Sequence, residues 1–173
     1  VSKVGRAKVW AVELSGSQQV VATAALHCAF LPDGRLLTCG DDLCLQNLTA
    51  DGVSHRLEPA SGRWGWVSAA GTGTICARHQ ADNAIHAWDT SGTPLGSLWQ
   101  GSGPTGAVRF EISPDATRLA IQEQDGNGNW SVNLFDCATQ TTLSQTPAVA
   151  SIGLAFAPDG SLLAFSRSKE VVV

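Results

Sequence analysis

The sequence contains three similar stretches, AFLPDGRLL (residues 29–37), EISPDATRLA (111–120) and AFAPDGSLLAF (155–165). Each stretch places Pro-Asp, followed by Gly or Ala, between two runs in which apolar and polar residues alternate. Proline fixes φ, aspartate accepts hydrogen bonds from nearby backbone N–H groups, and glycine tolerates positive φ, so the pattern is typical of a tight turn. The three stretches therefore predict three antiparallel β-hairpins.

The hairpins recur at a regular interval. A weaker copy, AAGTGTICA (69–77), lies between the first two stretches. In every copy we call the residue that follows the turn aspartate, or the equivalent residue of the weaker copy, the slot residue. The spacings between these slots are 39, 43 and 44 residues, for Gly34, Gly73, Ala116 and Gly160. A period of about 40–45 residues made of short alternating strands predicts a repeating unit of four antiparallel strands.

One repeat carries a more specific pattern. In DNAIHAWD (82–89), the turn residue Asp82 precedes a strand that ends in Trp88-Asp89. With the Pro-Asp-Gly hairpins and the period, this segment resembles the WD-repeat β-propeller family over nearly the whole chain. The resemblance implies an all-β fold, a β-propeller of four-stranded antiparallel blades. It also assigns structural turn or blade roles to Asp33, Gly34, Asp82, Trp88, Asp89, Asp115, Asp159 and Gly160.

The repeats depart from the family pattern in two ways. The family's Gly-His dipeptide is absent from every copy, and Trp-Asp is replaced by Phe135-Asp136 and Gln46-Asn47 in other repeats. The stretch SPDATRLAIQEQDGNGNWSVNLFD (113–136) is also similar to the repeats of TolB-type and peptidase-associated propellers. The repeats are therefore degenerate, and both propeller subclasses stay open.

The repeats divide the chain into about four blades' worth of a single domain, 1–173. We expect a half-blade at 1–19, full repeats at 20–62, 63–103 and 104–147, and a half-blade at 148–173. The two halves could close a four-bladed ring. We favour a segment of a longer propeller, because an open arc leaves sheet edges that a longer parent chain, or a second copy in a homodimer, would cover.

Charge and composition exclude several classes of partner. The formal net charge is −4, and no cluster of Lys or Arg offers a surface for nucleic acid. No apolar run reaches the roughly 18 residues that cross a membrane. Five cysteines without a Cys-x-x-Cys pair favour a reducing, cytoplasmic location, although the chain begins at Val1 and an upstream segment is expected to be missing.

The cysteines are predicted to be core residues. Cys28 and Cys39 are expected directly opposite each other across the Asp33-Gly34 turn, which would permit a disulfide. The matching positions in sister repeats hold Phe, Ile and Leu, so small buried thiols are the preferred interpretation. Cys44, Cys76 and Cys137 are interpreted in the same way.

No catalytic, metal or cofactor site is predicted. His27, His55 and His79 lack a neighbouring acid and nucleophile at a recognised spacing, and His86 is in the outward phase of its strand. DGNGN (125–129) resembles half of a calcium loop, but it also suits a hairpin connection, and no helices flank it. We therefore expect a protein without enzymatic activity.

The candidate contact residues are aromatic. Arg63, Trp64, Trp66 and Trp99 are placed on connections between repeats, which in this family reach the face where partners dock. The alternative is that these tryptophans wedge between blades. The predicted function is a non-catalytic protein–protein interaction scaffold, part of a larger multidomain protein, that binds a protein partner. The other candidate is a TolB-type or peptidase-associated ligand-binding or gating propeller.

Overall fold

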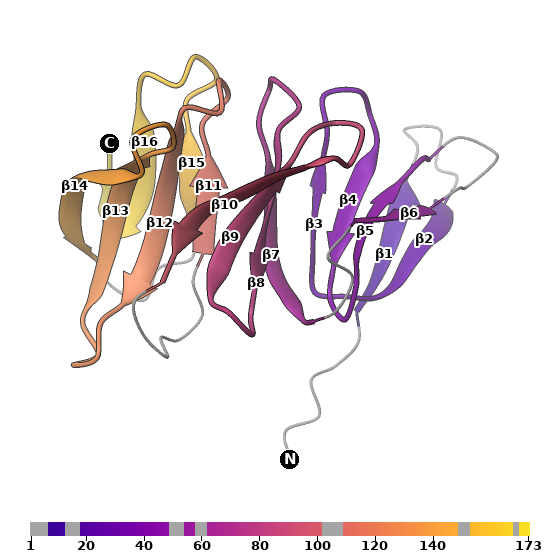
Figure 1. Ribbon diagram of the computed structural model, residues 1–173, viewed down its shortest axis with the longest axis horizontal. Helices are drawn as coiled ribbons and strands as arrows, with labels where there is room; N and C mark the ends of the chain where they lie inside the picture. Colours follow the sequence, from indigo (N-terminus) through magenta and orange to yellow (C-terminus); the bar gives the residue numbers. More distant parts are fainter. Residues whose placement is uncertain are drawn as a thin grey trace.

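The computed structural model describes residues 7–12, 18–48, 54–57, 62–101, 109–148, 153–167 and 170–173. Every helix or strand element in these residues is a β-strand (Figure 1). The strands form small antiparallel sheets whose members are consecutive along the chain. This arrangement follows from the sequence, because each tight turn returns the chain beside the strand that precedes it.

Three of the described sheets have four strands each and form the complete blades. The first complete blade comprises β3 (His27–Phe30), β4 (Leu36–Cys39), β5 (Leu43–Gln46) and β6 (Ser54–Arg56). The second comprises β7 (Trp64–Ala69), β8 (Ile75–His79), β9 (Ala84–Trp88) and β10 (Pro94–Gln100). The third comprises β11 (Arg109–Ile112), β12 (Arg118–Gln124), β13 (Trp130–Asp136) and β14 (Thr141–Ala148).

Two smaller sheets flank the complete blades. At the beginning, β1 (Ala7–Val12) pairs with β2 (Gln18–Ala25), which extends past the repeat boundary expected at residue 20 because Ala25 still pairs with Ala7. At the end, the sheet consists of β15 (Leu154–Phe156), β16 (Leu163–Arg167) and β17 (Glu170–Val172).

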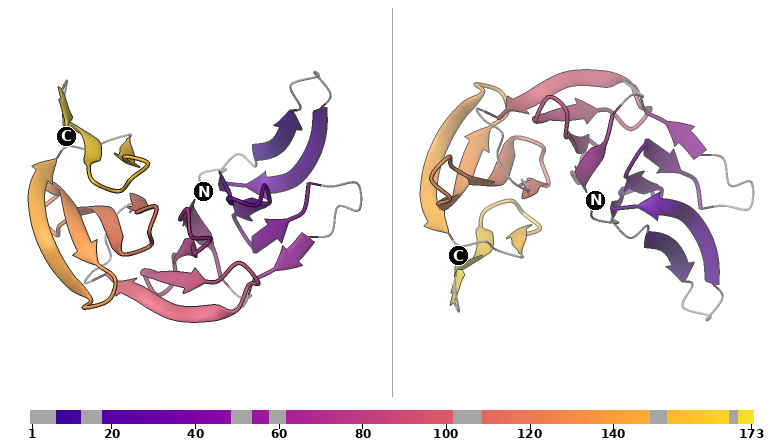
Figure 2. Two further views of the ribbon diagram at one scale, coloured as in Figure 1. Left: turned by 90° about the horizontal axis from the view of Figure 1, so that it is seen from above. Right: turned by 90° about the horizontal axis from the view of Figure 1, so that it is seen from below.

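The sheets are arranged side by side in an open arc (Figure 2). The first strands of successive sheets, β3, β7, β11 and β15, contact one another in that order, and β10 and β14 lie on the outer rim. This radial order of small antiparallel sheets is the architecture of a β-propeller. The prediction of an all-β propeller with three complete blades and two partial ones is confirmed.

The complete blades are joined by two interblade cores. Because side chains alternate along a strand, the second complete blade sends residues to both of its neighbours. The first interblade core lies between the first and second complete blades and contains Leu31, Leu37, Cys39, Leu43, Leu45, Leu57, Trp64, Val67, Ile75, Ala77 and Trp88. The second lies between the second and third and contains Ala70, Cys76, Ile85, Ala87, Phe110, Ile112, Leu119, Ile121 and Phe135.

We call the end of the arc that is uppermost in Figure 1 the upper end. It is formed by the loops between the first and second strands of successive sheets, which are residues 31–35, 70–74, 113–117 and 157–162. In each loop the slot residue has positive φ: 86° at Gly34, 92° at Gly73, 62° at Ala116 and 72° at Gly160. Its N–H donates to the carbonyl three residues earlier, at 2.8–3.0 Å. The structure thus confirms the repeat alignment, including the weak copy at residues 69–77.

Aspartates cap three of these loops. Oδ1 of Asp33, Asp115 and Asp159 accepts the backbone N–H two residues later, at 3.0, 3.1 and 3.0 Å. Hydrogen bonds from the Ser113 hydroxyl and from Thr117 lower the pKa of Asp115 to about 2, since they stabilise the carboxylate. Asp89 caps the β9–β10 turn in the same way, by accepting the N–H groups of Ser91 and Thr93.

The expected opposition of Cys28 and Cys39 is wrong. Cys28 pairs with Thr38, and Cys39 pairs with His27. Five residues, 31–35, separate the last paired residues of this hairpin, whereas six residues, 113–118 and 157–162, separate those of its sister hairpins. The register after the turn therefore differs by one position. As a result Cys28 is exposed rather than buried, Cys39 is buried, and all five cysteines are free.

Candidate functional site

Trp64 and Trp66 lie within β7. Their expected placement on the connection before this strand is therefore wrong. The pairing register shifts between Trp64 and Trp66, with Trp64 opposite His79 and Trp66 opposite Arg78. This bulge at Gly65 sends the two rings to opposite faces of the blade. Trp64 is 0% exposed and belongs to the first interblade core, whereas the half-buried Trp66 packs against the second.

Trp66 joins the inner strands of all three complete blades. The ring of His27, on β3, is stacked on Trp66 with 3.8 Å between centroids and an angle of 23° between planes. The guanidinium carbon of Arg109, on β11, lies 5.2 Å from the centroid of the Trp66 ring. Burial lowers the pKa of His27, a backbone hydrogen bond with Val67 opposes this shift, and the charge of Arg109 adds to the lowering. We call these three residues the Trp66 cluster.

The Trp66 cluster lies at the end of the arc opposite the hairpin loops. Its residues stand at or near the beginnings of their strands, and turns 40–42, 80–83 and 125–129 are found at this same end, the lower end in Figure 1. Arg63 is also here: it is exposed, and its carbonyl accepts the N–H of Gln80 at 2.8 Å.

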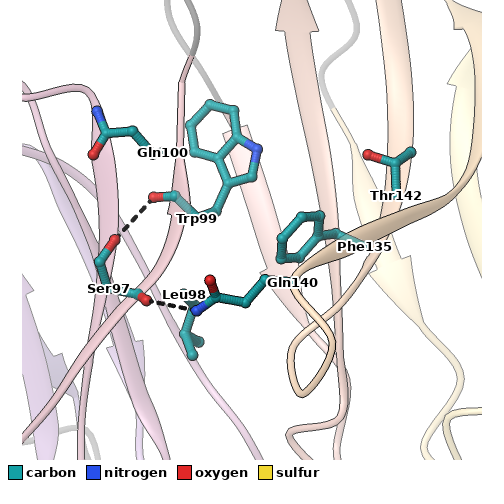
Figure 3. Close-up of a pocket in the computed structure, with 7 residues that line it drawn as sticks. All are labelled: Ser97, Leu98, Trp99, Gln100, Phe135, Gln140 and Thr142. Atoms are coloured by element: carbon teal, nitrogen blue, oxygen red, sulfur yellow. Dashed lines mark hydrogen bonds between the residues drawn. The ribbon is translucent and has the colours of Figure 1, made fainter.

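Trp99 lies apart from the Trp66 cluster, on the outer rim. It belongs to β10 rather than to a connection, which corrects the expected placement of this residue. Together with Phe135 it lines a hollow of about 560 Å³ between the second and third complete blades (Figure 3). Gln140 reaches across this hollow and donates from Nε2 to the carbonyl of Ser97 at 3.4 Å. The other lining residues are Leu98, Gln100 and Thr142.

A second group of side chains surrounds turn 80–83. Asp82 Oδ1 lies 3.0 Å from Nδ1 of His79, and Oδ2 lies 3.0 Å from Nε2 of His86. Oδ1 also accepts the N–H of Ala84 at 3.0 Å, as a turn aspartate does. Burial acts to raise the pKa of Asp82, but the contacts with both histidines and with Ala84 outweigh it and lower the pKa. We call His79, Asp82 and His86 the histidine–aspartate cluster.

Turn 80–83 is held from several sides. Arg78 Nη2 donates to Asn83 Oδ1 at 2.7 Å, and Asn83 itself has a φ of 56°. The N–H of Gly101 donates to the carbonyl of Asn83 at 3.0 Å, and the side-chain amide of Gln100 donates to the carbonyl of Asp82. These bonds fix the backbone that carries the Asp82 carboxylate.

The histidine–aspartate cluster was not anticipated as a unit. The sequence places His86 in the outward phase of its strand and gives His79 no neighbouring acid and nucleophile at a recognised spacing, yet both histidines contact Asp82. The sequence did contain a signal. His79 ends one strand, His86 lies in the next, and the tight turn between them contains Asp82. Strands joined by a tight turn bring such residues together.

Comparisons with known proteins concern the fold alone. No family model matches the chain, and no curated protein matches its sequence. A chain of a mitotic checkpoint complex aligns with a TM-score of 0.73 at 18% identity, covering 94% of this chain and 52% of that one. TolB from Acinetobacter baumannii aligns with a TM-score of 0.71 at 17% identity, covering 95% and 44%.

A third similar structure belongs to an enzyme. Hydrazine synthase from Kuenenia stuttgartiensis aligns with a TM-score of 0.65 at 21% identity, covering 91% of this chain and 49% of that one. The present chain therefore spans about half the length of the structures it matches. None of the described segments forms a helix with the length and hydropathy needed to span a bilayer. Geometry and comparisons together establish a β-propeller.

Proposed function

We propose that this chain is a protein-binding module of the WD-repeat type, a non-catalytic part of a larger cytoplasmic protein, and that it binds its partner at the lower end of the arc. The observation that carries the proposal is the Trp66 cluster. Three complete blades each contribute one side chain to a single stacked group at one end of the inner strands.

The chemistry of the cluster suits a protein contact. Tryptophan and arginine supply much of the binding energy in protein interfaces, because each presents a large contact area at a small entropic cost. Here the stacking by His27 and the guanidinium of Arg109 hold the half-buried indole in one position before any partner arrives. Arg63 is exposed at the same end and extends the proposed contact surface. Trp64 supports this surface from the core.

The test is affinity purification of the full protein from its native source, with quantitative mass spectrometry. We expect Trp66→Ala to reduce recovery of a specific partner and to weaken its binding by about thirtyfold, the effect of losing a residue worth about 2 kcal/mol. Arg109→Ala is expected to weaken binding less, because the indole itself and its stacking with His27 are retained. Circular dichroism must show that both variants stay folded.

Phe30→Ala supplies the matched control. Phe30 is also an aromatic residue of an inner strand, it is 65% exposed, and it lies near the upper end. Equal recovery of the partner by the native chain and by Phe30→Ala, together with its loss from Trp66→Ala, supports the proposal. Undiminished binding by a folded Trp66→Ala variant, or loss only in Phe30→Ala, would refute it.

One observation favours a ligand-binding propeller as the second candidate. The hollow beside Trp99 has a volume within the range of small-molecule sites, and it combines two aromatic rings with hydroxyl and amide side chains. If this hollow is the functional site, Trp99→Ala should abolish saturable binding of a small molecule from a metabolite library. Trp66→Ala should then leave that binding unchanged.

A further inference from the structure

We propose that the histidine–aspartate cluster is a binding site for a divalent transition-metal ion of the zinc class. The proposal concerns a different group of side chains from the Trp66 cluster and does not depend on a protein partner. His79, Asp82 and His86 offer two imidazole nitrogens and a carboxylate, and these ligand atoms all lie within 4.8 Å of one another.

The spacing of the ligand atoms suits such an ion. Zinc binds histidine nitrogen and carboxylate oxygen at about 2.0–2.2 Å, which puts adjacent ligands of a tetrahedral site about 3.3 Å apart. The two nitrogen–oxygen distances in the cluster are each 3.0 Å. Small rotations of the three side chains are therefore enough to surround an ion.

The surroundings hold both imidazoles in place. His79 lies directly opposite Trp64 across the β7–β8 pair, with 4.7 Å between ring centroids, and the Trp64 ring also meets His86 edge-on at 5.9 Å. A Cβ added to Gly62 would lie 1.9 Å from Nε2 of His79, so position 62 accepts this ring only because it is glycine. The buried Trp64 and the glycine at position 62 thus restrict the ring of His79. The hydrogen bonds around turn 80–83 restrict the carboxylate of Asp82.

Exposure leaves room for the ion and for water. The side chains of His79 and His86 are 12% and 21% exposed, whereas that of Asp82 is 45% exposed. The nitrogens therefore form the floor of the site, and the carboxylate stands at its mouth. Two histidines and one carboxylate with an open position suit zinc, nickel, copper or iron, whereas magnesium and calcium prefer sites made only of oxygen ligands.

The test is isothermal titration of the full chain with ZnCl₂ alone. We expect one Zn²⁺ to bind per chain and Asp82→Asn to weaken binding at least about tenfold, because an amide is a much poorer ligand than a carboxylate. This variant keeps the oxygen that accepts the Ala84 N–H, so the turn is retained. His86→Asn is expected to weaken binding further.

Two controls identify the ligands. Asp89→Asn alters the neighbouring turn aspartate, which accepts N–H bonds from Ser91 and Thr93. Cys28→Ser removes the exposed thiol, a competing zinc ligand. Both variants should bind Zn²⁺ as the native chain does. Co²⁺ provides a second readout, because nitrogen and oxygen ligands give visible bands without the near-ultraviolet charge transfer of a thiolate.

Three results would refute the proposal that this cluster binds a metal ion. They are failure of the native chain to bind Zn²⁺ at micromolar concentration, unchanged binding by Asp82→Asn and His86→Asn, and loss of binding in Cys28→Ser. The first would mean that Asp82 only accepts hydrogen bonds from the two imidazoles. Thermal unfolding of each variant without metal checks that it is folded, and Asp82→Asn remains informative if the histidine variants do not fold.

Discussion

The two ends of the arc differ in how closely the repeats agree. At the upper end the four hairpin loops share a positive-φ slot and the same backbone hydrogen bond across the loop. At the lower end each turn is different: turn 40–42 is closed by Gly40 and Asp42, turn 80–83 carries the histidine–aspartate cluster, and loop 125–129 is capped by Asp125. The repeat is thus preserved in the upper loops and varies in the lower turns, where the side chains of the two clusters lie.

The strongest test of this comparison is truncation of the tryptophan that anchors the lower end to the core. Trp64 is 0% exposed, so Trp64→Ala should cost about 3–5 kcal/mol of unfolding free energy, measured by urea denaturation. Trp66→Ala should cost distinctly less, because that ring is only half-buried. Equal costs would mean that the bulge at Gly65 does not separate a core residue from a surface residue.

The second test compares glycines at the two ends. Gly73, in an upper loop, has a φ of 92°, and an added Cβ would lie 2.3 Å from Cγ2 of Thr90. Gly73→Ala should therefore destabilise the protein by about 2 kcal/mol. Gly126, in loop 125–129, has no atom within 4 Å of an added Cβ, so Gly126→Ala should leave the midpoint of denaturation nearly unchanged. A large effect at Gly126 would contradict the distinction between the ends.

A third, pH-dependent effect belongs to the upper loops. The folded-state pKa of Asp115 is about 2, below its ordinary value of 3.8, so its charged form stabilises the fold above pH 3.8. That contribution is lost as the pH falls from 3.8 through 2. We expect Asp115→Asn to lower Tm at pH 7, and the difference from the native protein to shrink over this interval. A constant difference in Tm between pH 7 and pH 2 would show that the carboxylate charge is unimportant.

The smallest effect is expected at the one slot without glycine. Ala116 occupies it with a φ of 62°, a conformation that costs energy for a residue with a Cβ. Ala116→Gly should raise the stability by about 0.5 kcal/mol, after allowance for the greater freedom of glycine in the unfolded chain. Chemical denaturation in replicate can resolve this gain, and a loss of stability would mean that the methyl group makes compensating contacts with the second interblade core.

Local sequence patterns predicted the fold well. Features that depend on one inserted or missing residue were not predicted. The slots at Gly34 and Gly160 could be identified because turn chemistry is local. The register of Cys28 was missed because segment 31–35 is one residue short, and the opposite orientations of Trp64 and Trp66 could not be foreseen because a bulge interrupts the alternation. Both features have the same cause, since one residue reverses the faces of a strand.

The candidate sites were harder to predict than the fold. Trp66 was singled out as an aromatic contact residue, but its neighbours His27 and Arg109 come from other blades, and no spacing in the sequence indicates that they meet. The contacts of Asp82 with His79 and His86 depend on side-chain directions across a turn. Such contacts are decided by packing and register, which composition and periodicity do not specify.

The free cysteines allow the motions between blades to be measured one interface at a time. Cys39 lies in the first interblade core and Cys76 in the second, and burial raises the pKa of both thiols, that of Cys39 to about 12. Alkylation of either residue therefore requires its own interface to open, whereas the exposed Cys28 reacts without delay. The alkylation rates of Cys39 and Cys76 thus give two separate opening frequencies within one propeller.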